Sequence, residues 1–314
     1  MKLALWREII GRKGGFGERF PEEAAQILHG IEFEIDIDFV GDRTAVRFGP
    51  NLPIDPENVP KVSAVIAKDV AAKKKAGPFS RKPFPHFVVS PIGCVPKKKP
   101  GAVRVIHHLS FPYHGDSVNA SIRERGFILS GFGHAARAVI RAGRFCWLIK
   151  LDVEAAYKQV PVRPEDWPLL GFWWEGKYYY ERVLPFGLKS SCRLWELYAA
   201  ALHFFFEREL GVPVVIHYID DFLFVVQTKS EAERCKRAAS VLRSACAWGL
   251  ASPWLRIRPK APCSVSPSWE SSSTRFVLKL ASLQRSSLIC SNSPRFGTVN
   301  RRPVLRSFSP WPEC

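Results

Sequence analysis

Residues 214–226 read VVIHYIDDFLFVV, and this stretch decides the fold. Two runs of β-branched and aromatic residues flank an acidic centre, which predicts two strands joined by a tight turn with Asp220 and Asp221 at its tip. Adjacent carboxylates between apolar strands repel each other and cost free energy to desolvate, so a bound cation is the expected compensation. The alternative is an ordinary hairpin in which the two aspartates only supply turn chemistry.

The composition is that of a basic globular protein. Across 314 residues, 46 Lys and Arg face 29 Asp and Glu, which gives a formal net charge of +17 and favours a polyanionic partner, nucleic acid being the obvious one. No apolar run is long enough to cross a bilayer, and charge interrupts the N-terminus too early for a signal peptide. The eight cysteines are scattered, as in a reducing compartment. We therefore expect an intracellular protein, in cytoplasm or nucleus, that is neither secreted nor bound to a membrane.

The N-terminal part of the chain has few strong signals. Residues 1–55 are weakly patterned, although residues 31–40 alternate apolar and acidic side chains, which predicts a half-exposed strand with solvated acids. Residues 56–75 show helical periodicity, and we expect a helix with Lys73–Lys75 in its last turn and Gly77 as its C-cap. Lysines at this end complement the helix dipole and need no ligand to explain them.

A basic turn follows in the proline-rich stretch. Short strands are expected at residues 87–90 and 102–106, and residues 95–101 between them read VPKKKPG. Three lysines at a turn are often only a soluble loop. Beside a metal site, however, the same loop could hold a triphosphate.

The second half of the chain alternates strands and helices. We expect a buried strand at 145–153, a hairpin at 170–180, a helix at 191–210, and a capping box at 230–233 that opens a further helix. Together with the acidic hairpin, this order predicts an α+β domain with one sheet and helices on one face.

A third carboxylate strengthens the case for a cation. Asp152 ends one predicted strand, and Asp220 and Asp221 lie at the tip of the acidic hairpin. If these strands are neighbours in one sheet, the three carboxylates converge at one edge. Such a cluster can bind two Mg²⁺ ions, which stabilise the attacking and leaving oxygens in phosphoryl transfer.

Three motifs resemble those of reverse transcriptases and occur in that family's order. They are LDVEAAY at residues 151–157, LPFGL at residues 184–188, and YIDD at residues 218–221. The finer resemblance is to retrotransposons of the tyrosine-recombinase (DIRS-like and Ngaro-like) group, carried by residues 89–101, 104–110 and 191–196. It implies right-hand fingers and an antiparallel palm over residues 77–250, with residues 1–76 leading into the fingers.

The resemblance implies a role for each acidic residue. Asp152 and Asp220 would bind two Mg²⁺ ions, for which Mn²⁺ could substitute, and Asp221 would support the site. The carbonyl of Val153 would add a metal ligand.

It also implies contacts to nucleotide and nucleic acid. Tyr157 would be the steric gate under the sugar, although a core tyrosine is the alternative reading. The remaining expected contacts are Phe186 and Gly187 at the nucleotide pocket, Arg104 with Lys97 or Lys98 at the triphosphate, and Tyr218 and Lys189 at nucleic acid.

The pattern breaks after Leu250. Residues 251–314 are rich in Ser, Pro and Arg and show no clear helical or strand period, so we expect an irregular tail. The codons of this tail can be chosen, within the synonymous options, so that a reading frame shifted by one nucleotide encodes sequences that the family would place here. Our hypothesis is that the tail is a frameshifted or mis-spliced translation of lost palm and thumb sequence, and the nucleotide sequence tests it.

Three functions compete at this point. The first is an RNA-directed DNA polymerase domain that uses a primed RNA or DNA template and deoxynucleotides. The second is a non-catalytic relic that binds nucleic acid without extending it, which the absent thumb motifs favour. A two-metal nuclease explains the carboxylates but neither the LPFGL loop nor Tyr157. The sequence predicts no particular oligomeric state.

Overall fold

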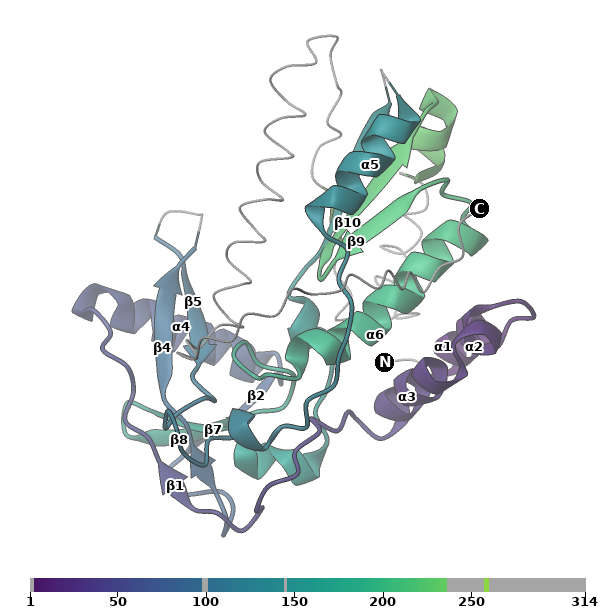
Figure 1. Ribbon diagram of the computed structural model, residues 1–314. Coiled ribbons are helices and arrows are strands. Elements are labelled where there is room, and N and C mark those ends of the chain that lie inside the picture. Colours follow the sequence, from purple (N-terminus) through teal and green to yellow (C-terminus); the bar gives the residue numbers. More distant parts are fainter. Residues whose placement is uncertain (1–2, 98–100, 144–145, 236–256, 260–314) are drawn as a thin grey trace, which may run out of the picture.

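The computed structural model describes residues 3–97, 101–143, 146–235 and 257–259. Within this part of the chain, two larger sheets and one hairpin are surrounded by helices (Figure 1). The helices are α1 (Leu3–Ile10), α2 (Phe16–Arg19), α3 (Pro21–Glu32), α4 (Val59–Ala71), α5 (Phe132–Ala142) and α6 (Ser191–Phe204), the last extended by a π-helical turn, η5 (Phe205–Glu209). Short 3₁₀ turns are η1 (Pro56–Asn58), η2 (Asn119–Ser121), η3 (Ala156–Gln159) and η4 (Pro164–Leu169). The predicted α+β class is confirmed.

The first sheet, which we call the palm sheet, holds the acidic hairpin. Its strand order is β11 (Ile257–Pro259), β6 (Trp147–Val153), β10 (Asp221–Val226) and β9 (Val215–Tyr218), all antiparallel. The predicted hairpin and the predicted strand that ends in Asp152 are therefore both present and adjacent.

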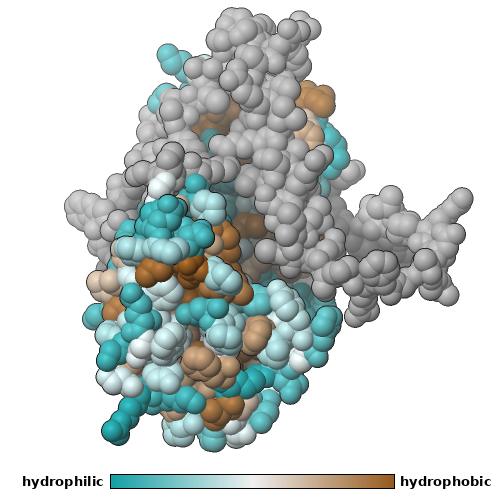
Figure 2. All heavy atoms as spheres, turned by 90° about the vertical axis from the view of Figure 1, so that its left-hand side faces the viewer, coloured by the Kyte–Doolittle hydropathy of each residue, from teal (hydrophilic) through white to brown (hydrophobic). Residues whose placement is uncertain are grey.

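The second sheet and the separate hairpin together form what we call the fingers. The sheet has the order β1 (Arg47–Phe48), β3 (Val88–Val89), β7 (Gly171–Trp174), β8 (Lys177–Glu181) and β2 (Lys75–Phe79). The hairpin pairs β4 (Ile92–Pro96) with β5 (Val103–His107), so the basic turn lies at its tip. On the face shown in Figure 2 the coloured surface is mostly hydrophilic, interrupted by separate hydrophobic patches.

Helices cover both faces of the palm sheet, so the expectation of one covered face is too narrow. Alternate residues of a strand point to opposite faces. Leu151 and Phe222, which are register partners, belong to the large core that includes α6. Leu148 and Val225, also register partners, pack with Ala135 of α5 in a separate cluster. No helix was expected at residues 132–142 from the sequence.

Helices α1 to α3 fill the weakly patterned N-terminal segment and complete the large core. The Trp6 ring meets Tyr198 of α6 edge-on with centroids 5.9 Å apart, and Phe16 meets Phe204 at 5.8 Å. These helices are short, and they depend on packing against one another and against α6, which explains why local periodicity did not reveal them.

The predicted end of α4 was wrong. The helix ends at Ala71, Lys73 adopts φ +57°, and the Lys74 N–H donates to the Asp69 carbonyl at 2.8 Å. Lys75 therefore does not lie in the last helical turn; it opens β2 and is buried in an ion pair with Glu181. A buried ammonium needs such a partner, and that partner comes from a strand distant in sequence.

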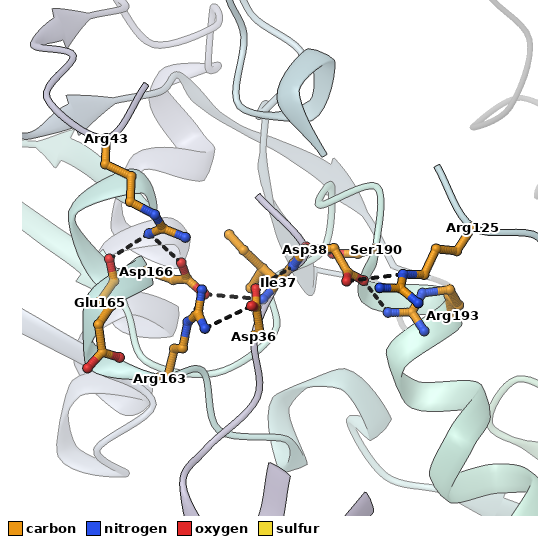
Figure 3. Close-up of polar contacts among 10 residues, drawn as sticks. All are labelled: Asp36, Ile37, Asp38, Arg43, Arg125, Arg163, Glu165, Asp166, Ser190 and Arg193. Atoms are coloured by element: carbon orange, nitrogen blue, oxygen red, sulfur yellow. Dashed lines mark hydrogen bonds and ion pairs between the residues drawn. The ribbon is translucent and has the colours of Figure 1, made fainter. Parts of the chain in front are cut away.

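Residues 35–39 form an irregular strap rather than a strand, and Asp38 within it adopts φ +64°. They make isolated bridges through Ile35 to Val162 and through Phe39 to Ile122. The acids are not simply solvated, because Asp38 pairs with Arg193 of α6 and with Arg125 at 3.3 Å (Figure 3). The strap thus joins α6 to two other segments.

Asp166 is the buried anchor of this strap (Figure 3). Its side chain is 0% exposed and lies 2.6 Å from Arg43 and 3.0 Å from Arg163, while Oδ2 accepts a hydrogen bond from the Ile37 N–H at 3.2 Å. Two cations and one backbone donor compensate the desolvation of this carboxylate.

We expect Asp166→Asn to lower the free energy of unfolding by about 3 kcal/mol, because it leaves two arginines facing a neutral amide. Urea denaturation measures this change. The exposed Asp116→Asn is the control and should leave the transition midpoint unchanged. Equal midpoints for the two variants would show that the anchor contributes no stability.

The predicted capping box is displaced by two residues. The Glu231 N–H donates to Thr228 Oγ1 at 3.2 Å, and the Thr228 N–H donates to Glu231 Oε2 at 2.9 Å. Residues 229–235 are helical, and the rest of that expected helix lies outside the described residues. In the tail, β11 pairs with the outer edge of β6, which is one exception to the irregular structure expected there.

Candidate active site

The turn between β9 and β10 holds Ile219 in a left-handed conformation, with φ +55°. This conformation is costly for a β-branched residue and persists only when the surroundings impose it. Two hydrogen bonds do so: Trp195 Nε1 donates to the Ile219 carbonyl at 2.8 Å, and the Val153 N–H donates to the Asp220 carbonyl at 2.8 Å. Helix α6 and strand β6 therefore fix the turn from two sides.

The three predicted carboxylates come together at this turn. Asp152 and Asp221 are register partners on adjacent strands. Burial, followed by the charges of Asp221 and Asp152, raises the pKa of Asp220 to about 6. Asp221 pairs with Lys150, and its Oδ1 is buried without a hydrogen-bond partner in the described structure.

These carboxylates suit a divalent cation. Crowded, partly desolvated oxygens are the donor set that Mg²⁺ prefers, and a sheet edge leaves room for substrate oxygens. Among the residues that the structure describes, no three His, Cys, Asp or Glu side chains form a ready-made metal cage. An open site completed by a substrate is consistent with both observations.

Beside the carboxylates lies an aromatic pair with a cation. Tyr157 lies two residues after Ala155, whose φ is +53°. The ring centroid of Tyr157 is 5.2 Å from that of Phe186. The Arg104 guanidinium carbon lies 4.9 Å from the Phe186 centroid. Burial raises the pKa of Tyr157, so its hydroxyl remains neutral. The structure thus brings three of the predicted nucleotide-binding residues into one group.

The loop that carries Phe186 and Gly187 is tightly held against the fingers. Gly187 has φ +107°, and a Cβ there would lie 2.0 Å from the His107 carbonyl oxygen. Asn119 donates to the Gly187 carbonyl at 2.7 Å and accepts from the Lys189 N–H at 2.8 Å. Any side chain at position 187 would therefore push the loop away from β5.

The remaining predicted site residues do not lie together. Lys97 is exposed at the start of the basic turn, and Lys98 lies outside the described residues. Lys189 is exposed, 3.8 Å from Glu124, and Tyr218 is the register partner of Asp221. Sequence reasoning missed Lys150 and Asn119. Lys150 was available in principle, because it lies two residues before Asp152 and hence on the same strand face.

A series of polar side chains links the acidic hairpin to helix α6. His217 Nε2 donates to Glu196 Oε1 at 2.6 Å, and the Nδ1 atoms of His217 and His203 lie 2.7 Å apart. Glu196 and His203 both belong to α6, whereas His217 belongs to β9. These contacts add a polar link between the helix and the strand that leads into the acidic turn.

His203 makes stability depend on pH. An unfolded chain protonates a histidine near pH 6.5, whereas burial, followed by the charge of His217, lowers the pKa of His203 in the folded protein to about 3. The unfolded state then binds more protons between these values, so the free energy of unfolding falls as the pH drops through this window. Between pH 7 and pH 5, His203 alone accounts for about 2 kcal/mol.

We therefore expect the free energy of unfolding to fall by about 2 kcal/mol less in His203→Gln than in the unsubstituted protein when the pH drops from 7 to 5. Urea denaturation at each pH measures the difference. Equal losses would contradict the assignment of a neutral buried His203, whatever the stability of the variant at pH 7.

The sequence of this chain matches a known protein family. Residues 95–251 match the sequence model of the family described as "Reverse transcriptase (RNA-dependent DNA polymerase)". The chain belongs to the reverse transcriptase family. The family as a whole is one of RNA-dependent DNA polymerases, which are nucleotidyltransferases and generally use divalent metal ions.

One solved structure agrees with the fold of this reverse transcriptase chain. A foamy viral protease–reverse transcriptase in complex with double-stranded DNA has a TM-score of 0.51 and 18% identity, covering 77% of this chain and 41% of that one. A Prototype Foamy Virus protease–reverse transcriptase mutant has a TM-score of 0.49 and 19% identity, covering 77% and 31%. This chain thus spans less than half the length of either. A search of curated proteins found no match.

Proposed function

We propose that this chain forms the fingers and palm of a retrotransposon RNA-directed DNA polymerase, which joins a primer 3′-hydroxyl to the α-phosphate of a deoxynucleotide. The observation that carries the proposal is the register of β6 and β10, which sets Asp152 against Asp221 with Asp220 beside them. A retrotransposon of the tyrosine-recombinase group is supported by the sequence of residues 89–101, 104–110 and 191–196.

Asp152 and Asp220 would hold two Mg²⁺ ions, for which Mn²⁺ could substitute, with the Val153 carbonyl as a further ligand. When bound, such ions neutralise charge that develops on the attacking and leaving oxygens. Asp221 is the supporting carboxylate, because its pairing with Lys150 already compensates much of its charge. Burial, followed by the charges of Asp221 and Asp152, raises the pKa of Asp220, so its charged form is disfavoured, and a bound cation would offset that cost.

The aromatic pair would orient the nucleotide. Tyr157 would pack under the sugar and exclude a 2′-hydroxyl, while Phe186 and Gly187 would shape the pocket around the base. Arg104 would contact the triphosphate together with Lys97 or Lys98. Positive charge beside a metal site is what a nucleoside triphosphate requires for binding.

Template and primer would lie across the palm and the adjacent loop. Lys189 is exposed and offers a phosphate contact, and Tyr218 lies beside the carboxylates at the expected position of the primer end. The net charge of +17 favours a nucleic-acid duplex whose affinity falls with salt. The proposed organisation is a leading segment over residues 1–76, fingers and palm over 77–250, and a tail over 251–314.

A second candidate is a non-catalytic relic that binds primed templates without extending them. The observation that favours it is the change in composition after residue 250, where a Ser-, Pro- and Arg-rich sequence replaces the motifs expected of the family.

Primer extension on poly(rA)·oligo(dT) with Mg²⁺ separates the two candidates. We expect extension by the unsubstituted chain and a loss of at least about a thousandfold in Asp220→Asn, because a metal-binding charge is removed. Asp116→Asn is the matched control and should extend normally. An unsubstituted chain that binds the duplex but adds no nucleotide would favour the relic.

The proposed role of Tyr157 is tested by sugar selectivity. Tyr157→Val opens space beneath the sugar, so discrimination between dTTP and UTP should fall by about tenfold to a hundredfold. Single-nucleotide incorporation kinetics measure the ratio of kcat/KM values. Unchanged discrimination would make Tyr157 a packing residue of the core.

A further inference from the structure

Next to the proposed nucleotide pocket, the structure holds an ion-pair cluster that the sequence analysis did not assign. Lys158 directly follows Tyr157, and its Nζ pairs with the carboxylate of Asp69 on α4. Asp69 is 7% exposed and lies 3.9 Å from Lys75, which has its own partner in Glu181. Lys75 and Glu181 therefore balance each other inside the fingers, and Asp69 is the counter-ion of Lys158.

Positive charge is in excess around this pair. Burial, followed by the charges of Arg104, Lys158 and Lys68, lowers the pKa of Lys97. Burial lowers the pKa of Lys74, and Lys158 adds to that effect. Among the described residues, the cations whose charges act on Lys74, Lys75 or Lys97 are Lys68, Arg104 and Lys158, and the carboxylates that act on them are Asp69, Glu154 and Glu181. Lys158 acts on all three of these lysines, and an excess of neighbouring cations favours a multivalent anion.

We propose that Lys158 is a further nucleotide-binding residue, which exchanges its contact with Asp69 for the triphosphate of the incoming nucleotide. The inference rests on the proposed function, whose pocket it extends. Asp69 then acts as a positioning residue that holds the Lys158 ammonium near the pocket before nucleotide binds.

The arrangement fits this exchange for two reasons. Lysine is a compact point charge on a flexible stem, so its ammonium can move from a carboxylate to a phosphate without moving the backbone. Lys158 is also adjacent in sequence to Tyr157, whose ring contacts Phe186, and Phe186 carries Arg104 over its face. Lys158 and Arg104 therefore both adjoin the pair formed by Tyr157 and Phe186, Lys158 through the chain and Arg104 through its contact with the ring.

Binding of inorganic tripolyphosphate to the full chain, measured by calorimetry, tests the proposal apart from catalysis. We expect Lys158→Gln to weaken binding by about tenfold, the effect of one lost charge at a partly buried site. Asp69→Asn should strengthen it by about threefold, because the competing carboxylate is gone. Lys158→Arg should restore binding. Lys61→Gln, on the same helix as Asp69, should not alter it.

The opposite signs expected for the two substitutions exclude a merely structural ion pair. If Lys158→Gln and Asp69→Asn both lower thermal stability but leave the tripolyphosphate affinity at the value of the unsubstituted chain, the proposal is overturned. In primer extension, Lys158→Gln should raise KM for dTTP about tenfold with little change in kcat. A chain that never extends a primer, yet shows the opposite shifts in affinity, would refute the polymerase function while supporting the anion site.

Discussion

The antiparallel pairing of β6 with β10 is the constraint on which the rest of the structure depends. This pairing sets Asp152 opposite Asp221, and the hydrogen bond from the Val153 N–H to the Asp220 carbonyl closes the turn against it. Like charges would drive these strands apart at this end, so the cost must be met elsewhere. It is met by apolar register pairs further along the strands, such as Leu151 with Phe222, and by Lys150 beside Asp221.

Helix α6 turns that pairing into a rigid platform. It supplies the Trp195 hydrogen bond to the strained turn, the polar chain through Glu196 and His203, and the Tyr198 face against which the N-terminal helices pack. Near the start of α6, Arg193 forms an ion pair with Asp38 of the strap. Because one helix serves all these contacts, a change in its position would be transmitted to the acidic turn.

The fingers meet the palm through close backbone contacts as well as through the large apolar core, which holds Val88 of β3 together with Leu151 of β6. Gly187 lies against the His107 carbonyl, and Asn119 ties that loop to the segment after β5. The ion pair of Lys158 with Asp69 connects α4 to η3, the turn that follows β6. Charged and backbone groups thus set the shape of the proposed nucleotide pocket, which suits a ligand that brings both a base and a polyanion.

The sequence by itself determined the acidic hairpin, the strand ending in Asp152, the α+β class and the family, because alternating apolar strands and ordered short motifs are local signals. Tertiary structure alone decided three things. It buried Lys75 with Glu181, it covered the second palm face with α5, and it joined Lys158 to Asp69. Each depends on a partner distant in the chain, whose effect on free energy exists only once folding has removed water from between the two groups.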